Sequence, residues 1–301
     1  MSEQVDLKRC AHCGSWIPDV ATMCASCGTS DVDGARAGVT APARRPARDL
    51  QLPTGWTVTR ILIWMNALYL LWCLRVQFAF SPDEGVTASL LSFSGLNKGL
   101  FYTGAYVAPL VESGQWWRVF TAFFLHGGIF HIGMNMWVLA RVGNLLEELI
   151  GPWRFATIYL VSGISSTLAI TIWFVWIQQV PNPTPMVGAS GAVFGVLGAL
   201  AMFALRSGTG GGRQMGRVLI RDIGFMLILG WIVPMISNTG HIGGLLPGLA
   251  FGLVVRERFA DRLNPGAQRG WMFATLVLFA ATGVALAHGV GFSLQEMGSL
   301  R

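Results

Sequence analysis

The chain has 301 residues, of which 53% are hydrophobic and 12% charged, and its formal net charge is +6 at pH 7. A soluble domain carries about 25% charged residues, so this composition excludes an ordinary soluble globule and indicates an all-α polytopic membrane protein. Arginines supply nearly all of the positive charge and cluster between apolar runs. That distribution indicates membrane-topology signals and argues against a nucleic-acid-binding face.

The first 30 residues contain four of the five cysteines, in two Cys-x-x-Cys pairs with ten residues between them. Two such pairs can place four thiolates at the corners of a tetrahedron, so Cys10, Cys13, Cys24 and Cys27 predict a structural zinc ribbon over residues 1–30. Paired disulfides are the alternative, which a reducing compartment disfavours. The segment lacks the basic start, apolar middle and cleavage site of a secretory signal peptide, so we expect it to be retained.

A ribbon of this size has almost no core, so zinc would supply its folding free energy. Three roles stay open for it: binding a cytosolic partner, holding substrate tails, or stabilising the protein. Residues 31–57 are rich in Ala, Gly, Pro and Arg. They have too little apolar content to fold and predict a flexible linker, either a plain tether or a segment whose arginines contact anionic lipid head groups.

Seven apolar segments follow, each close to the ~20 residues that span a bilayer. Four connections, beginning with the linker, are basic, whereas the loops at 178–184 and 237–240 carry no charge. By the positive-inside rule the N-terminus is cytoplasmic and the C-terminus lies outside the cell membrane. This orientation independently places the cysteines in the reducing cytosol. The segments lie at about 58–80, 118–142, 153–178, 188–206, 217–237, 241–259 and 270–291.

A small set of polar side chains lies within these apolar segments. The predicted topology puts Ser190 and His241 near the outer ends of the fourth and sixth segments, with His131 and Asn135 partway down the second. Strongly polar groups at membrane depth are costly and mark functional sites. Side chains from three helices therefore converge at one level, facing the outer side.

These residue types indicate serine hydrolase chemistry. A serine becomes a nucleophile when a neighbouring base takes its proton, and histidine suits that role near neutral pH. No Asp or Glu falls in the outer half of any segment, and the only lysines are Lys8 and Lys98. We therefore expect a dyad of Ser190 and His241. The absence of a His-Glu-x-x-His motif and of an intramembrane Asp pair predicts catalysis without a metal or other cofactor.

The second segment offers candidates for stabilising an oxyanion. His131 and Asn135 are spaced i, i+4, so they share one helix face and can point together at the fourth segment. Interhelical hydrogen bonding is the alternative role for Asn135. His126 precedes the Gly127-Gly128 break and is expected to be a structural hydrogen-bonding group where the loop enters the helix.

The fourth and sixth segments each carry small residues at four-residue spacing. Such faces let two helices approach closely in a bilayer, which the dyad requires, although packing alone would also explain them. The residues are Gly191, Gly195 and Ala199 in one segment and Gly244, Gly248 and Gly252 in the other. Phe194, one turn after Ser190, should stack beneath the His241 imidazole; simple filling of space is the alternative.

These motifs together resemble the rhomboid family of intramembrane serine proteases. The matching residues are Trp117-Arg118, His126, His131-x-x-x-Asn135, Gly188-Ala189-Ser190-Gly191 and His241-x-x-Gly244-x-x-x-Gly248. Two positions depart from the family pattern. Phe194 stands where a tyrosine is common, and Pro247 interrupts the sixth segment, where it removes the amide that would bond Gly243.

The resemblance implies a six-helix protease core over residues 58–260 and a seventh transmembrane helix with a tail over 261–301. It implies a Ser190 and His241 dyad, an oxyanion pocket of His131, Asn135 and the Ser190 amide, and a first loop at about 81–115 braced by Trp117-Arg118. The implied substrates are single-pass membrane proteins, cut near the outer ends of their transmembrane helices. An inactive rhomboid-like protein that binds membrane clients is the alternative. A transporter would show inverted repeats and carboxylates at depth, and neither is visible.

Overall fold

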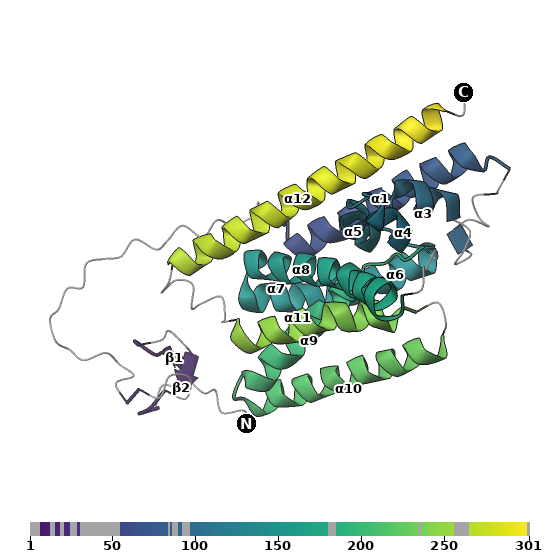
Figure 1. Cartoon of the computed structure of the whole chain (residues 1–301). Helices are drawn as coiled ribbons and strands as arrows, with labels where there is room; N and C mark the ends of the chain where they lie inside the picture. The colour runs from purple at the N-terminus through teal and green to yellow at the C-terminus, as the bar shows by residue number, and fades with distance from the viewer. Residues whose placement is uncertain are drawn as a thin grey trace. The chain divides into compact units, whose positions relative to one another are not determined.

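The computed structural model describes residues 7–12, 16–18, 21–24, 29–30, 55–83, 85, 90–91, 97–179, 185–233, 236–255 and 265–299. The chain divides into two compact units, Met1–Arg48 and Asp49–Arg301. Figure 1 shows the helices that make up the described part of the second unit. This division falls inside the predicted linker, of which residues 31–54 lie outside the described residues.

The first unit contains a two-stranded antiparallel sheet. Strands β1 (Leu7–Arg9) and β2 (Trp16–Pro18) pair so that Lys8 lies opposite Ile17. Cys10, Ile17 and Cys24 form a small buried cluster beside this sheet. Cys13 and Cys27 lie outside the described residues, and the described ones alone hold no group of three or more metal-ligating side chains. The zinc site therefore stays a prediction.

Three helices of the second unit are each long and apolar enough to cross a bilayer, judged over the described residues only. They are α1 (Val58–Phe80), α8 (Pro152–Thr171) with its continuation η3 (Ile172–Ile177), and α12 (Pro265–Gly298). A fourth span results if two helices joined at a sharp bend are counted together. The protein is thus a helical, multi-pass membrane protein.

The second predicted segment, 118–142, is bent at the expected Gly127-Gly128 break, and its second arm extends beyond the predicted end to Ile150. The helices α5 (Arg118–Thr121) and η1 (Ala122–Phe124) meet the helix that follows at 87°. That second arm runs through α6 (Ile129–Val138), η2 (Leu139–Gly143) and α7 (Asn144–Ile150). The break has a local cause, because Leu125 is extended and Gly127-Gly128 have low helix propensity.

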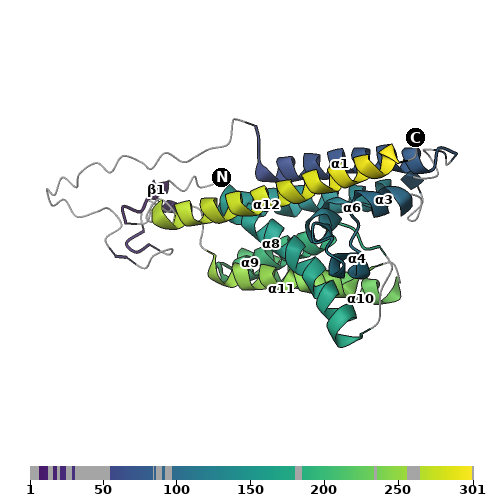
Figure 2. The ribbon, with the colours of Figure 1, turned by 45° about the horizontal axis from the view of Figure 1, so that its top comes forward.

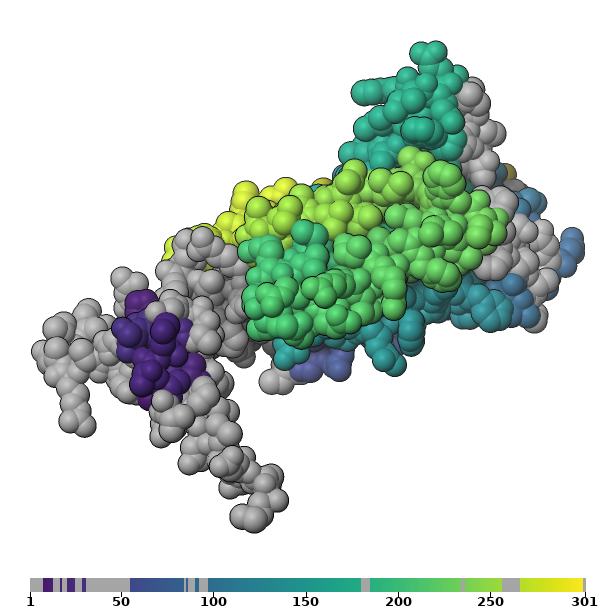
Figure 3. All heavy atoms as spheres, turned by 90° about the horizontal axis from the view of Figure 1, so that it is seen from below, coloured from purple at the N-terminus to yellow at the C-terminus, as the bar shows by residue number. Residues whose placement is uncertain are grey.

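Helix α9 (Ser190–Arg206) lies at the centre of the bundle, and most of its side chains are buried. At 17 residues it is about 26 Å long, shorter than the ~30 Å hydrocarbon core. Helix α10 (Gly210–Ile232) begins at Gly210, earlier than the predicted Arg217, because the Thr209 hydroxyl caps it by accepting from the Gly212 amide at 3.0 Å. Helix α11 (Asn238–Val254) contains Pro247. Figure 3 shows the face that carries α10 and α11.

The predicted close approach of the fourth and sixth segments is confirmed. A Cβ atom added to Gly244 would collide with the carbonyl oxygen of Gly191, and one added to Gly248 would collide with that of Gly195. No residue other than glycine fits these two positions of α11 while the helices keep this spacing. The backbones of α9 and α11 therefore touch along the face that carries Ser190 and His241.

The described part of the predicted first loop includes the short helices α3 (Asn97–Thr103) and α4 (Ala108–Glu112). The segment between them pairs with the segment that leads into α9, through two backbone hydrogen bonds of 3.0 and 2.9 Å between Tyr106 and Met186. Helix α12 lies alongside α1, α3 and α5 (Figures 1 and 2). The first loop is thus tied both to the segment that leads into α9 and to α12.

Candidate active site

The structure brings Ser190 and His241 together. Ser190 is the first residue of α9, and its Oγ lies 2.9 Å from the Nε2 atom of His241 near the start of α11. The His241 side chain is almost fully buried, with 9% of its surface exposed. A serine hydroxyl within hydrogen-bond reach of a shielded imidazole is the arrangement that nucleophilic catalysis needs.

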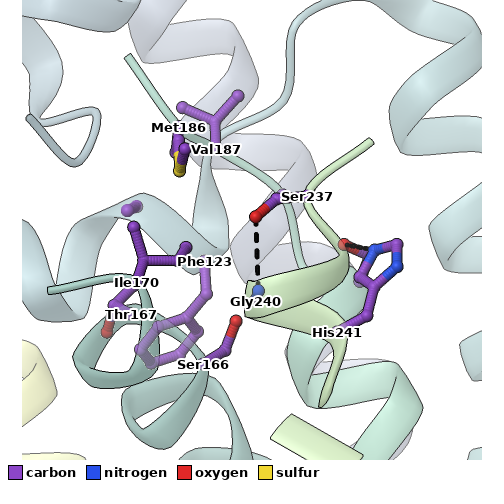
Figure 4. Close-up of a pocket in the computed structure, with 12 residues that line it drawn as sticks. Phe123, Ser166, Thr167, Ile170, Met186, Val187, Ser237, Gly240 and His241 are labelled. Carbon is purple, nitrogen blue, oxygen red and sulfur yellow. Dashed lines mark hydrogen bonds between the residues drawn. The ribbon is translucent and has the colours of Figure 1, made fainter. Parts of the chain in front are cut away.

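Local backbone structure explains how each member of the pair is placed. Gly188 has φ +130°, a conformation that L side chains rarely adopt, and its amide donates to the Ala122 carbonyl at 3.1 Å. This turn delivers the chain to Ser190. On the other helix, the Ser237 hydroxyl caps α11 by accepting from the Gly240 amide at 3.2 Å, as Figure 4 shows. The cap fixes the turn that carries His241.

The expected stack on the histidine is confirmed. The rings of Phe194 and His241 lie 4.2 Å apart between centroids, with an interplanar angle of 12°. The Nδ1 atom of His241 is buried and has no hydrogen-bond partner within the described residues. The imidazole is therefore oriented by its bond to Ser190 and by a flat aromatic contact, without a carboxylate behind it.

His131 faces the segment that carries the nucleophile. The Gly127 amide donates to its Nδ1 at 3.3 Å, so a neutral ring carries its proton on Nε2. A Cβ atom added to Gly188 would lie 2.8 Å from that Nε2 atom and 3.7 Å from Ser190 Oγ. The Nε2–H group is thus a donor beside the nucleophile, which is the position expected of an oxyanion-binding residue.

Asn135 and His126 form hydrogen bonds with residues near Ser190, namely His131 and Ala189. The Asn135 amide nitrogen donates to the His131 carbonyl at 2.9 Å, one turn back in its own helix, instead of pointing at Ser190. The His126 ring is fully buried and meets His131 edge-on at 5.0 Å between centroids. Its Nε2 atom accepts a long hydrogen bond of 3.5 Å from the Ala189 amide. His126 therefore contacts the residue immediately before the nucleophile.

Trp117 and Arg118 anchor the first loop. Both side chains are buried, and the Arg118 guanidinium donates to the carbonyls of Phe101 at 2.9 Å and Ala105 at 2.7 Å. It also donates to the Gln115 side chain at 2.6 Å. One cation thus ties three points of the loop to the start of α5, which is the bracing that the sequence led us to expect.

A pocket opens next to the dyad, and most of its lining was not predictable from the sequence. The chain segments that form it come from η1, α8, the strand-like segment before α9, and the start of α11 (Figure 4). Its walls beyond the dyad include Ala122, Phe123, Ser166, Ile170 and Met186. Small and apolar residues of this kind occur throughout the chain, so no sequence pattern distinguished them from packing residues.

The fold and this cluster define a multi-pass membrane protein with a serine and histidine paired inside its helical bundle. Residues 113–258 match the rhomboid domain. The chain is 39% identical over 164 residues to "Rhomboid protease GluP" of Bacillus subtilis, covering 53% of this chain and 31% of that protein. It is 33% identical over 208 residues to "RHOMBOID-like protein 1" of Arabidopsis thaliana, covering 66% and 50%.

A third similarity extends over most of both chains. "Rhomboid-like protease 1" of Toxoplasma gondii is 26% identical over 257 residues, covering 79% of this chain and 78% of the relative. The chain spans about a third of the Bacillus protein and half of the Arabidopsis protein. Together these matches show that residues 113–258 are similar to the rhomboid domain and that the chain is similar to rhomboid proteases.

Proposed function

We propose that the protein is an intramembrane serine endopeptidase. The observation that carries this proposal is the 2.9 Å separation of Ser190 Oγ and His241 Nε2 inside a membrane helix bundle. The rhomboid match over residues 113–258 and the protease names of two relatives support it. No metal or other cofactor enters the mechanism.

In the first step, His241 Nε2 takes the proton of the Ser190 hydroxyl while Oγ attacks the carbonyl carbon of the scissile peptide. The tetrahedral intermediate collapses when the carbon–nitrogen bond breaks, and the protonated histidine gives its proton to the departing amine. The acyl group stays on Ser190. Water, deprotonated by the same nitrogen, then attacks the ester and releases the second product with Ser190 restored.

The developing oxyanion needs donors on the side of Ser190 away from His241. The Nε2–H group of His131 and the backbone amide of Ser190 are the proposed donors, because a Cβ atom on Gly188 would meet both the His131 ring and Ser190 Oγ. Asn135 would join them after its side chain leaves the His131 carbonyl, to which it is bonded at 2.9 Å. Asn135 is therefore the donor that binding of substrate has to reorient.

The proposed substrates are single-pass membrane proteins cut near the outer ends of their transmembrane helices. A peptide bond inside a stable helix is shielded, so such a site needs small or helix-breaking residues. The proposed location is the cell membrane, with the N-terminus cytoplasmic and the C-terminus outside. Residues 58–260 would form the six-helix core, with α12 as a seventh transmembrane helix.

The N-terminal unit is proposed to bind one structural zinc ion through Cys10, Cys13, Cys24 and Cys27. The support is that Cys10 and Cys24, the first cysteine of each pair, share one buried cluster with Ile17. The adjacent strands β1 and β2 provide the hairpin of a zinc ribbon. This unit would face the cytosol, where a protein partner is one candidate ligand.

The test is cleavage of a generic single-pass substrate by purified protein in detergent, compared with Ser190→Ala. We expect cleavage by the wild type and none by the variant, with fluorophosphonate labelling only of the wild type. Equal cleavage by both forms would exclude Ser190 as the nucleophile. Binding of substrates by the wild type without cleavage, across a panel, would instead favour an inactive rhomboid-like protein.

A further inference from the structure

Helix α12 contacts the aromatic and cationic pair that anchors the first loop. The ring centroid of Phe292 lies 5.5 Å from that of Trp117 and 6.0 Å from the Arg118 guanidinium carbon. His288, one turn earlier on the same helix, lies 5.9 Å from Trp117. One turn of the last helix therefore packs on residues that begin α5.

Gly289 is the point of closest approach in this contact. A Cβ atom there would lie 2.9 Å from the Tyr69 hydroxyl, 3.2 Å from the Trp117 ring and 3.3 Å from the Thr103 carbonyl oxygen. The Tyr69 hydroxyl itself donates to the Thr103 carbonyl at 2.8 Å. Side chains and backbone of α1, α3 and the start of α5 thus meet against one glycine of α12, where a larger residue would force its neighbours to shift.

A short path of backbone leads from this contact to the pocket. Trp117 directly precedes α5, and α5 continues without interruption into η1, whose Ala122 and Phe123 line the pocket. The Ala122 carbonyl accepts the hydrogen bond of 3.1 Å from Gly188, two residues before the nucleophile. A shift of Trp117 would therefore be transmitted through the short helical segment Arg118–Phe124 to the wall of the pocket.

Two side-chain hydrogen bonds also hold helix α5 in place. Thr121 Oγ1 donates to the Gly104 carbonyl at 2.7 Å, and Thr167 Oγ1 of α8 donates to the Val119 carbonyl at 3.0 Å. These bonds hold the segment against the first loop and against α8. The α12 contact adds a further support, because His288 and Phe292 pack against the Trp117 ring.

We propose that α12 positions the substrate pocket, acting through the contact of Gly289 and Phe292 with Trp117. The last helix is then a working part of the site and not only a membrane anchor. Gly289 and Phe292 are positioning residues, because they touch Trp117 and not the reacting atoms. The inference rests on the proposed protease function for its effect on cleavage, whereas its structural coupling is measurable without activity.

The first test compares Gly289→Leu with Gly291→Leu in the full chain. An added Cβ at Gly291 meets no atom within 4 Å, so this variant controls for a leucine in the same turn of α12. Hydrogen exchange of the amides of residues 117–124 should accelerate in Gly289→Leu and stay unchanged in Gly291→Leu. Unchanged exchange in a folded Gly289→Leu protein would overturn the proposal.

The second measurement is cleavage of a single-pass substrate by the same variants. We expect kcat/KM to fall about ten- to a hundredfold in Gly289→Leu, because misplacing a pocket wall by an ångström has effects of that size. Fluorophosphonate labelling of Ser190 should persist, since the dyad is untouched. Faster exchange with unchanged cleavage would show that the contact does not position the pocket. A wild type that neither cleaves nor labels refutes the protease function, while the exchange experiment still judges the coupling.

Two milder changes keep the test decisive if Gly289→Leu does not fold. Phe292→Ala removes the ring beside Trp117, and Phe273→Ala, at an α12 position with 70% of the side chain exposed, is its control. Gly289→Ala should lower kcat/KM less than leucine does. Combining Gly289→Ala with Tyr69→Phe removes the hydroxyl nearest to the added methyl group and should recover part of the lost kcat/KM. If Phe292→Ala leaves kcat/KM unchanged and the double variant shows no recovery, the contact does not position the pocket.

Discussion

The ring of Phe194 lies flat against the imidazole of His241, 4.2 Å away and nearly parallel to it. Catalytic histidines usually have a hydrogen-bonded group behind the ring to hold its orientation. Here the rear nitrogen of His241 has no such partner within the described residues. The stack therefore restrains the rotation that a carboxylate restrains elsewhere. In the proposed mechanism, Phe194 would assist catalysis by limiting where the base can point.

Replacing Phe194 separates orientation from simple filling of space. Phe194→Tyr keeps a flat ring and should be tolerated, whereas Phe194→Ala should lower kcat by up to about tenfold, since an aromatic pair contributes ~0.5–1.5 kcal/mol beyond its buried area. Phe194→Leu is the informative variant, because leucine is similar in bulk but not flat. Steady-state cleavage kinetics distinguish them: leucine working as well as tyrosine would mean that the ring only fills space.

The glycine contact between α9 and α11 sets the distance between nucleophile and base. Gly244→Val adds atoms where the Gly191 carbonyl already lies, so α9 and α11 must move apart or their backbones must distort. We expect a loss of stability of about 1–3 kcal/mol together with loss of fluorophosphonate labelling. Gly224→Val on α10 is the matched control, because a Cβ there meets nothing within 4 Å. Thermal unfolding in detergent and labelling check both effects; equal behaviour of the two variants would contradict this account.

Much of the site was predictable because membranes make polar side chains informative. Ser190 and His241 stand out in apolar segments, and the alternation of charged connections places both near the same surface. The small residues at four-residue spacing likewise predicted which helix faces touch. These inferences work because a polar side chain inside a membrane is costly and usually has a hydrogen-bonding or catalytic role. Small residues at regular spacing usually mark a close contact between helices.

Other features had no comparable signal in the sequence. Gly127-Gly128 mark a break in the second segment, but neither this pair nor hydropathy predicts the 87° angle between the two arms. The pocket wall at Ala122 and Ile170 is made of ordinary apolar residues. The contact between Gly289 and Trp117 joins positions far apart in the chain, and a lone glycine in a helix says nothing about its partner.

Zinc binding by the first unit is testable without reference to catalysis. A chelator should release about one zinc per metal-replete chain and unfold the ribbon, because a structural site supplies folding energy to a domain with little core. The membrane unit should keep its thermal stability. Cys24→Ser should abolish stoichiometric binding. Metal analysis and circular dichroism measure these outcomes, and a replete wild-type protein without zinc would refute the prediction.

Gly188 lies next to both His131, the proposed oxyanion donor, and Ser190, the proposed nucleophile. The effect of adding one methyl group at Gly188 can therefore be worked out from the structure. Its φ of +130° is strained for any L residue, and the new Cβ would lie 2.8 Å from His131 Nε2. The methyl group must push the His131 ring away from the place where the oxyanion forms. Removing one oxyanion donor lowers kcat about 10²–10³-fold. We therefore expect Gly188→Ala and His131→Ala each to lower kcat by about this factor.

The double variant tests whether the two residues act on the same step. If Gly188→Ala works by displacing His131, then Gly188→Ala combined with His131→Ala should be little worse than either single change, because the displaced donor is already gone. Independent effects would instead multiply. Gly133→Ala, on α6 where an added Cβ meets nothing within 4 Å, is the control and should retain wild-type kcat. Fully multiplicative losses in the double variant would show that strain at Gly188, and not the position of His131, limits the reaction.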